Sequence, residues 1–81
     1  MYYLQMKQAE NVVYMSKGFE TYEQANKTLS FFETSIIEAT ENKIAAVNVL
    51  DINDLPVILT KNILMNSITS LVKKANENEE K

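Results

Sequence analysis

Hydrophobic and polar residues alternate at the start of the chain, where Tyr2, Leu4 and Met6 are separated by Tyr3, Gln5 and Lys7. A period of two is typical of a half-buried strand. A second β-prone run covers residues 12–15, and the turn-forming Asn11 stands before it. The pattern predicts an N-terminal β-hairpin. Gly18, the only glycine, follows this hairpin and is expected where the backbone needs a positive φ.

The next segment has the spacing of an amphipathic helix. Apolar residues recur every three or four positions, at Tyr22, Ala25, Leu29, Phe32 and Ile36. Thr21 stands three residues before Gln24, as in a capping box that begins a helix. We predict a helix from Tyr22 to Ala39, ended by a turn at residues 41–43 in which Asn42 takes the left-handed conformation.

Alternation returns from Ile44 to Ile52 and predicts a third strand. Ala45, Val47 and Val49 lie on one side of it, and Ala46, Asn48 and Leu50 lie on the other side. Residues 53–56, which include the only proline, read as a turn.

The segment from Val57 to Leu64 fits two structures. Its run of Val, Ile, Leu and Thr favours a fourth strand, with Val57, Leu59 and Ile63 toward the core and Ile58 and Leu64 on the opposite face. Asp54 as a cap and Pro56 in a first turn would instead begin one long C-terminal helix from about Leu55. We prefer the strand.

A final helix is predicted after Asn66 or Ser67, ending in Lys73 and Lys74, where lysines suit the negative end of the helix dipole. The resulting fold class is α+β, a single small domain over residues 1–75. Its order is ββαββα, with a four-stranded antiparallel sheet and the helices on one face. The alternative is ββαβα with the long C-terminal helix. Residues 76–81 are expected to form an acidic disordered tail.

Composition removes most kinds of chemistry. The chain has no cysteine, no histidine and one glycine. It therefore has no disulfide, no usual zinc ligands, no thiolate or imidazole for catalysis, and no glycine-rich phosphate loop. We expect no enzyme activity, no metal or cofactor site and no small-molecule substrate.

The charge pattern predicts neither a strongly basic nor a strongly acidic surface. The net charge is −3, and the acidic tail carries much of it, so the folded part is nearly neutral. All eight basic residues are lysines, and the absence of arginine disfavours sequence-specific DNA binding. The alternative function is a nucleic-acid-binding regulator whose electrostatic contact is Lys61, Lys73 and Lys74. In this alternative, Tyr3 and Tyr14 stand on an open sheet face near Lys7 and Lys17 and stack bases.

No signal peptide or membrane span is visible, and a cytoplasmic protein is expected. The richness in lysine, asparagine and isoleucine resembles the composition of proteins from AT-rich genomes.

Apolar residues lie on more faces than one sheet and two helices easily cover, and exposed apolar patches usually mark protein contacts. We therefore expect a small non-enzymatic protein–protein interaction module that forms a homodimer. A phage- or plasmid-type accessory protein that binds and modulates a host protein would fit this description. The candidate interface residues are Ile58, Leu64, Phe31, Ile37, Tyr3 and Tyr14.

Overall fold

The computed structural model describes residues 1–74, which form five strands and two helices. In chain order these are β1 (Tyr2–Gln8), β2 (Asn11–Met15), α1 (Tyr22–Thr40), β3 (Ala46–Leu50), β4 (Pro56–Thr60), α2 (Lys61–Asn66) and β5 (Ile68–Lys73). The strands form two antiparallel sheets, one in the order β2-β1-β5 and one made of β3 and β4. The α+β class is confirmed, but the single four-stranded sheet is wrong.

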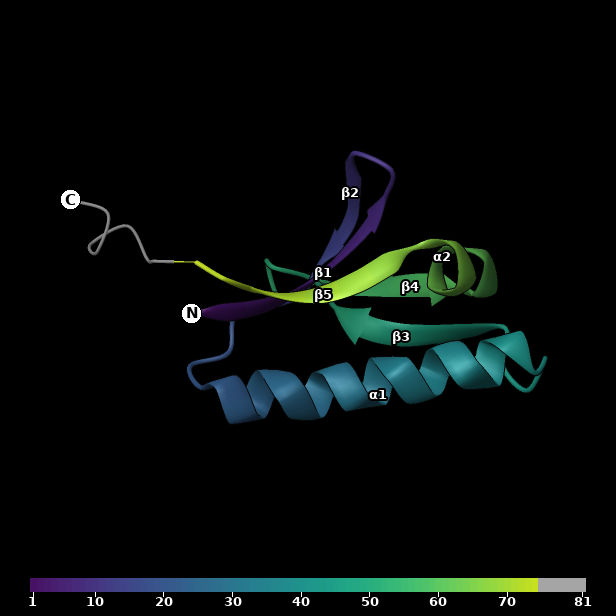
Figure 1. Cartoon of the computed structure of the whole chain (residues 1–81), viewed down its shortest axis with the longest axis horizontal. Coiled ribbons are helices and arrows are strands. Elements are labelled where there is room, and N and C mark those ends of the chain that lie inside the picture. The colour runs from purple at the N-terminus through teal and green to yellow at the C-terminus, as the bar shows by residue number, and fades with distance from the viewer. Residues whose placement is uncertain (75–81) are drawn as a thin grey trace.

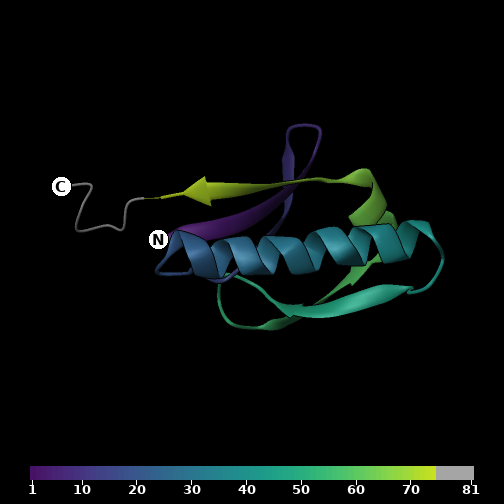
Figure 2. The ribbon, with the colours of Figure 1, turned by 60° about the horizontal axis from the view of Figure 1, so that its bottom comes forward.

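The long helix α1 holds the two sheets together. It runs along the molecule below the strands in Figure 1, and the turned view in Figure 2 shows it beside both β1–β5 and the β3–β4 hairpin. Its Phe32 and Ala39 belong to one core cluster with residues from both sheets and from α2. That cluster consists of Leu4, Met6, Tyr14, Phe32, Ala39, Leu59 and Leu64. The two sheets therefore share one hydrophobic core.

The predicted C-terminal helix is wrong, because residues 68–73 form strand β5. It pairs antiparallel with β1, and Leu4 lies opposite Leu71. Isoleucine, threonine and valine in this run suit a strand, and β1 offers a second edge that needs hydrogen-bond partners. This pairing with a distant segment overrides the short helical spacing of the run. The alternative helix from Leu55 is also wrong, since β4 covers residues 56–60.

The predicted fourth strand stops early. It ends at Thr60, whose hydroxyl oxygen accepts a hydrogen bond from the backbone N–H of Ile63 at 3.4 Å and caps α2. The helical turn rotates Leu64 into the core, where it is 1% exposed. The expectation that Leu64 lies on the outer face was wrong for this reason.

The N-terminal hairpin is confirmed, with a bulge at Val13 where the pairing shifts between Met6 and Lys7. Gly18 has no positive φ, so the predicted reason for it is wrong. A Cβ atom at Gly18 would lie 2.6 Å from the Met1 sulfur and 3.2 Å from the Tyr3 ring. The side chains of Met1 and Tyr3 therefore leave little room for a side chain at Gly18.

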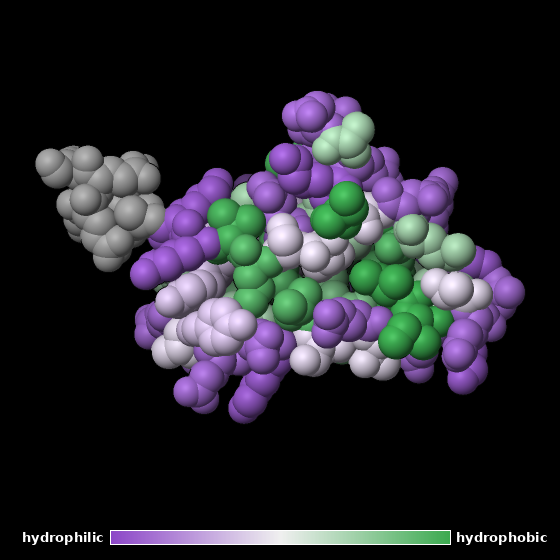
Figure 3. All heavy atoms as spheres, viewed as in Figure 1, coloured by the Kyte–Doolittle hydropathy of each residue, from purple (hydrophilic) through white to green (hydrophobic). Residues whose placement is uncertain are grey.

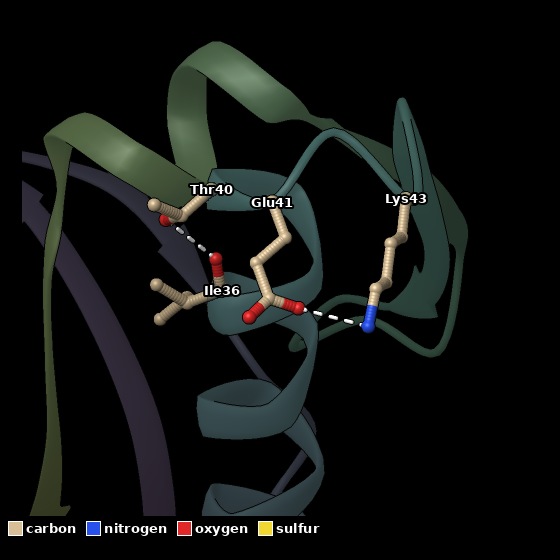
Figure 4. A network of polar contacts seen from close by, with 4 residues as sticks. All are labelled: Ile36, Thr40, Glu41 and Lys43. Carbon is tan, nitrogen blue, oxygen red and sulfur yellow. Dashed lines mark hydrogen bonds and ion pairs between the residues drawn. The ribbon is translucent and has the colours of Figure 1, made fainter.

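Both ends of α1 match their sequence signals. Thr21 Oγ1 accepts from the N–H of Gln24 at 3.2 Å, and Asn42 ends the helix with φ 62°. Figure 4 shows the last turn, where Thr40 Oγ1 donates to the Ile36 carbonyl at 2.8 Å and Lys43 pairs with Glu41 at 3.0 Å. That ion pair is mostly exposed and contributes little stability.

Candidate interaction surface

The β3–β4 hairpin has one covered face and one open face. Val47 lies opposite Leu59 and Val49 lies opposite Val57, and these four side chains face the core. The alternate pairs are all exposed, and together we call them the outer hairpin face: Ala46 with Thr60, Asn48 with Ile58, and Leu50 with Pro56. None of the six is charged. Such a face differs from the charged surface usual for a small soluble domain.

Large apolar side chains gather at the turn end of this face. Leu50 is 42% exposed and Ile58 is 63% exposed, and they lie on neighbouring strands. Ile52 and Leu55, in the turn between the strands, are 47% and 57% exposed. Figure 3 shows the side of the molecule that carries β5 and α1, where hydrophobic residues also reach the surface among hydrophilic ones.

Asp51 fixes the turn that presents Ile52 and Leu55. Its Oδ1 accepts the N–H groups of Asn53 at 2.8 Å and of Leu55 at 3.0 Å. Asp54 takes a left-handed conformation with φ 60°. A carboxylate that bonds its own backbone two residues on is a known turn former, so the turn geometry is held locally.

One edge of β3 is open along part of its length. The Lys61 N–H donates to the Ala45 carbonyl and the Asp51 N–H donates to the Leu55 carbonyl. Because such bonds alternate along an antiparallel pair, the backbone groups of Ala46, Asn48 and Leu50 point away from β4. At Leu50 the edge closes, since the Tyr14 hydroxyl donates to the Leu50 carbonyl at 2.6 Å.

The next residue closes the edge completely. Ser16, just after β2, forms an isolated antiparallel bridge with Asp51. Ser16 is itself held firmly: its hydroxyl accepts from the Leu4 N–H at 2.9 Å and donates to the Lys17 carbonyl at 2.8 Å. The open part of the edge therefore covers Ala46 and Asn48 and stops at Leu50.

An apolar groove lies at this closed end, between β3, α1 and the chain that follows β2. It has a volume of about 320 Å³ and is lined by Tyr14, Ser16, Lys17, Phe19, Thr28, Phe31, Phe32, Val49 and Leu50. Phe31 is 50% exposed there. The Lys17 ammonium lies 5.9 Å from the centre of the Phe19 ring. The groove thus offers aromatic walls and one cation.

Tyr14 joins the groove to the core. Its ring stacks on Phe32 with centroids 5.7 Å apart. Burial, and secondarily the charge of Asp51, raises the pKa of Tyr14 to about 12. The phenol therefore stays protonated at neutral pH and acts as a hydrogen-bond donor rather than as a base.

The six residues expected at an interface do not form one surface. Ile58 lies on the outer hairpin face and Phe31 lines the groove. Tyr3 is half-buried against Gly18. Ile37 is 58% exposed, about 120° around α1 from Phe31 by helical geometry.

Tyr14 and Leu64 are buried in the core, at 6% and 1% exposure, so neither is available to a partner. Leu50, Ile52 and Leu55 were not among the interface residues predicted from the sequence. The signal for them was present in the alternation of β3 and in the turn-forming Asp51.

The lysines expected to hold nucleic acid lie apart. Lys61 begins α2, whereas Lys73 ends β5 at the other end of the molecule (Figure 1). The Lys61 ammonium bonds Asn42 Oδ1, and the Lys73 ammonium lies 5.7 Å from the Tyr2 ring. The buried Tyr14 also cannot stack with bases beside Tyr3. These residues do not assemble the basic, aromatic patch that was expected.

Within residues 1–74, no group of three or more acidic side chains is placed to hold a metal ion. In the same residues, no helix combines the length and the apolar character needed to cross a membrane. The expected tail at 76–81 lies outside the described residues. No protein-family model, curated protein or solved structure matches the chain.

Proposed function

We propose that this chain is a small non-enzymatic protein-interaction module, and that the outer hairpin face is its docking surface. The observation that carries this proposal is the uncharged, apolar and uncovered character of that face. An exposed apolar patch is costly in water unless a partner covers it, because burial of apolar area is the main favourable term in association.

A second copy of the chain is the proposed occupant. Because the outer hairpin face carries no charge, two copies can bring it together around a two-fold axis without like-charge repulsion. Leu50 and Ile58 would then be the apolar anchors, with Asn48 beside Ile58 and Thr60 toward the polar rim. A role as a phage- or plasmid-type accessory factor that modulates a host protein stays a prediction from composition.

The test is the molecular mass in solution, measured by light scattering over a range of concentrations. We expect a dimer for the unchanged chain. Ile58→Lys places a charge at the centre of the face and is expected to weaken the dimer at least about a hundredfold, since one unpaired buried charge costs several kcal/mol.

The matched control is Ile37→Lys, which makes the same change at an equally exposed isoleucine on α1. It is expected to leave the dimer unchanged. A monomer at every concentration, or equal loss of the dimer in both variants, would remove the proposed self-association through this face.

A further inference from the structure

We infer that the open edge of β3 and the adjoining groove form a binding site for the C-terminal end of an extended partner peptide. This site lies beside the outer hairpin face and does not depend on self-association through it. The peptide would add a third strand to the β3–β4 sheet and place its last side chain in the groove.

Part of the β3 backbone is free to pair with a further strand. The N–H and C=O groups of Ala46 and Asn48 point away from β4, and both residues are exposed. A row of unpaired groups on a strand edge is a template for one more strand. β3 lacks the charged side chains and the proline that commonly protect such edges, whereas the β4 edge carries Pro56, which has no N–H to offer.

The open edge of β3 stops at Leu50. Ser16 lies opposite Asp51 in an isolated bridge, and the Tyr14 hydroxyl already donates a hydrogen bond to the carbonyl of Leu50. An added strand cannot continue past this point without displacing the chain after β2. A chain end avoids this conflict, because it needs no onward path.

The charge at the closed end of the edge selects which end of a peptide fits. Lys17 lines the groove at the closed end, and it has no ion-pair partner among residues 1–74. The Asp51 carboxylate accepts two backbone N–H bonds within its own turn. The Lys17 ammonium can pair with a free carboxylate at the closed end, whereas it would repel a free ammonium. The C-terminus lies at the Leu50 end when the peptide runs parallel to β3.

The groove then selects the last side chain. Phe31 on α1 and Leu50 on β3 line it with exposed apolar surface. Its volume of about 320 Å³ is at the lower limit for a ligand pocket. A single leucine, isoleucine or phenylalanine side chain would fill much of it. The ligand class is thus an extended segment that ends in a large apolar residue with a free carboxylate.

The test begins with two pools of random peptides, one displayed with free C-termini and one with free N-termini. Only the first pool is expected to be enriched on the immobilised protein, and its final position should converge on large apolar residues. The best peptide is then made as the free acid and as the C-terminal amide, and binding is measured by fluorescence anisotropy. The amide should bind about tenfold more weakly.

Variants assign the roles within the site. Lys17→Gln should weaken the free acid about tenfold and leave the amide unchanged, which makes the two changes non-additive. Phe31→Ala should weaken both forms. Lys43→Gln, which removes an exposed lysine in the turn after α1, is the control and should change neither. Circular dichroism checks that each variant is folded.

Three outcomes would overturn this inference: no enrichment of the free C-termini, equal binding of acid and amide, or an unchanged affinity in Lys17→Gln. The measurement is repeated in Ile58→Lys, which removes the proposed dimer. Peptide binding retained in Ile58→Lys would show that the peptide site does not need the dimer. Dimerisation retained in Lys17→Gln would show that the dimer does not need the peptide site, so the two proposals can fail separately.

Discussion

Tyr14 combines a packing role and a polar role in one side chain. Its ring lies on Phe32 inside the core, while its hydroxyl closes the β3 edge at the Leu50 carbonyl. Because the phenol is buried beside Asp51, ionisation would place a negative charge in a poorly solvated position. The stability of the fold should therefore depend on this one proton at high pH.

The sign of that dependence follows from the two states. The pKa of Tyr14 is 10.0 when it is free and about 12 in the folded chain. Below pH 10 both states keep the proton and the full stability is present. Between these values the unfolded state loses its proton first, so stability falls as pH rises, by roughly 2–3 kcal/mol in total.

Tyr14→Phe is expected to abolish this loss of stability above pH 10. At neutral pH it should lower the free energy of unfolding by about 1 kcal/mol through the lost hydrogen bond. The measurement is urea unfolding at a series of pH values. Tyr22→Phe, which removes an exposed phenol, is the control and should keep this loss of stability at high pH. The same pH dependence in Tyr14→Phe as in the unchanged chain would contradict the role given to this hydroxyl.

The short helix α2 changes which residues serve the core. It turns Leu64 inward and leaves the next residue, Met65, 45% exposed. Leu64→Ala should reduce the free energy of unfolding by about 2–5 kcal/mol, as buried leucine truncations do. Met65→Ala should change it by less than about 1 kcal/mol.

Urea unfolding of these two variants tests the position of α2. A continued strand would also place the two residues on opposite faces, but with Leu64 outside. A small loss in Leu64→Ala together with a large loss in Met65→Ala would therefore contradict the helix and support the strand that the sequence pattern predicted.

Elements with a strong local pattern could be predicted from the sequence. The stripe from Tyr22 to Ile36, the cap at Thr21 and the turn at Asn42 lie within a few residues of what they control, so α1 was predicted almost to its last residue. The separation of Val47 and Val49 from Ala46, Asn48 and Leu50 on the two faces of β3 was predicted for the same reason. Local hydrogen bonds and periodicity are sufficient for such elements.

The C-terminal third could not be predicted in this way. Ile68, Leu71 and Val72 are spaced as on a short helix, yet they lie in β5 because β1 has a free edge for them. That edge belongs to a segment far away in the sequence, and no local pattern reports it. The predicted interface was partly wrong for the same reason, since the burial of Leu64 and Tyr14 depends on how distant elements pack.

At the scale of the whole molecule, α1 makes the two sheets dependent on each other. Phe32 is 1% exposed and contacts the core from the middle of the helix. Phe32→Ala should cost about 3–5 kcal/mol, a large part of the stability of a domain of this size. Because both sheets share that core, both should loosen together.

Amide hydrogen exchange measures this directly. Protection of Leu4 in β1 and of Val49 in β3 is expected to fall to a similar extent in Phe32→Ala. Phe31→Ala, which truncates the exposed neighbour, should leave both protected. Loss of protection in one sheet alone would show that the sheets are separate cooperative units.

The pairing of β1 with β5 also has a consequence for how the chain reaches this fold. The β1–β2 and β3–β4 hairpins and α1 are built from neighbouring residues, whereas β5 must return across all of them to pair Lys7 with Ile68. Closing a loop of that length has a large entropic cost and slows folding. Until β5 arrives, the inner edge of β1 stands open to other chains. The rate of this last step, more than the final stability, should then govern how much of the newly made protein aggregates.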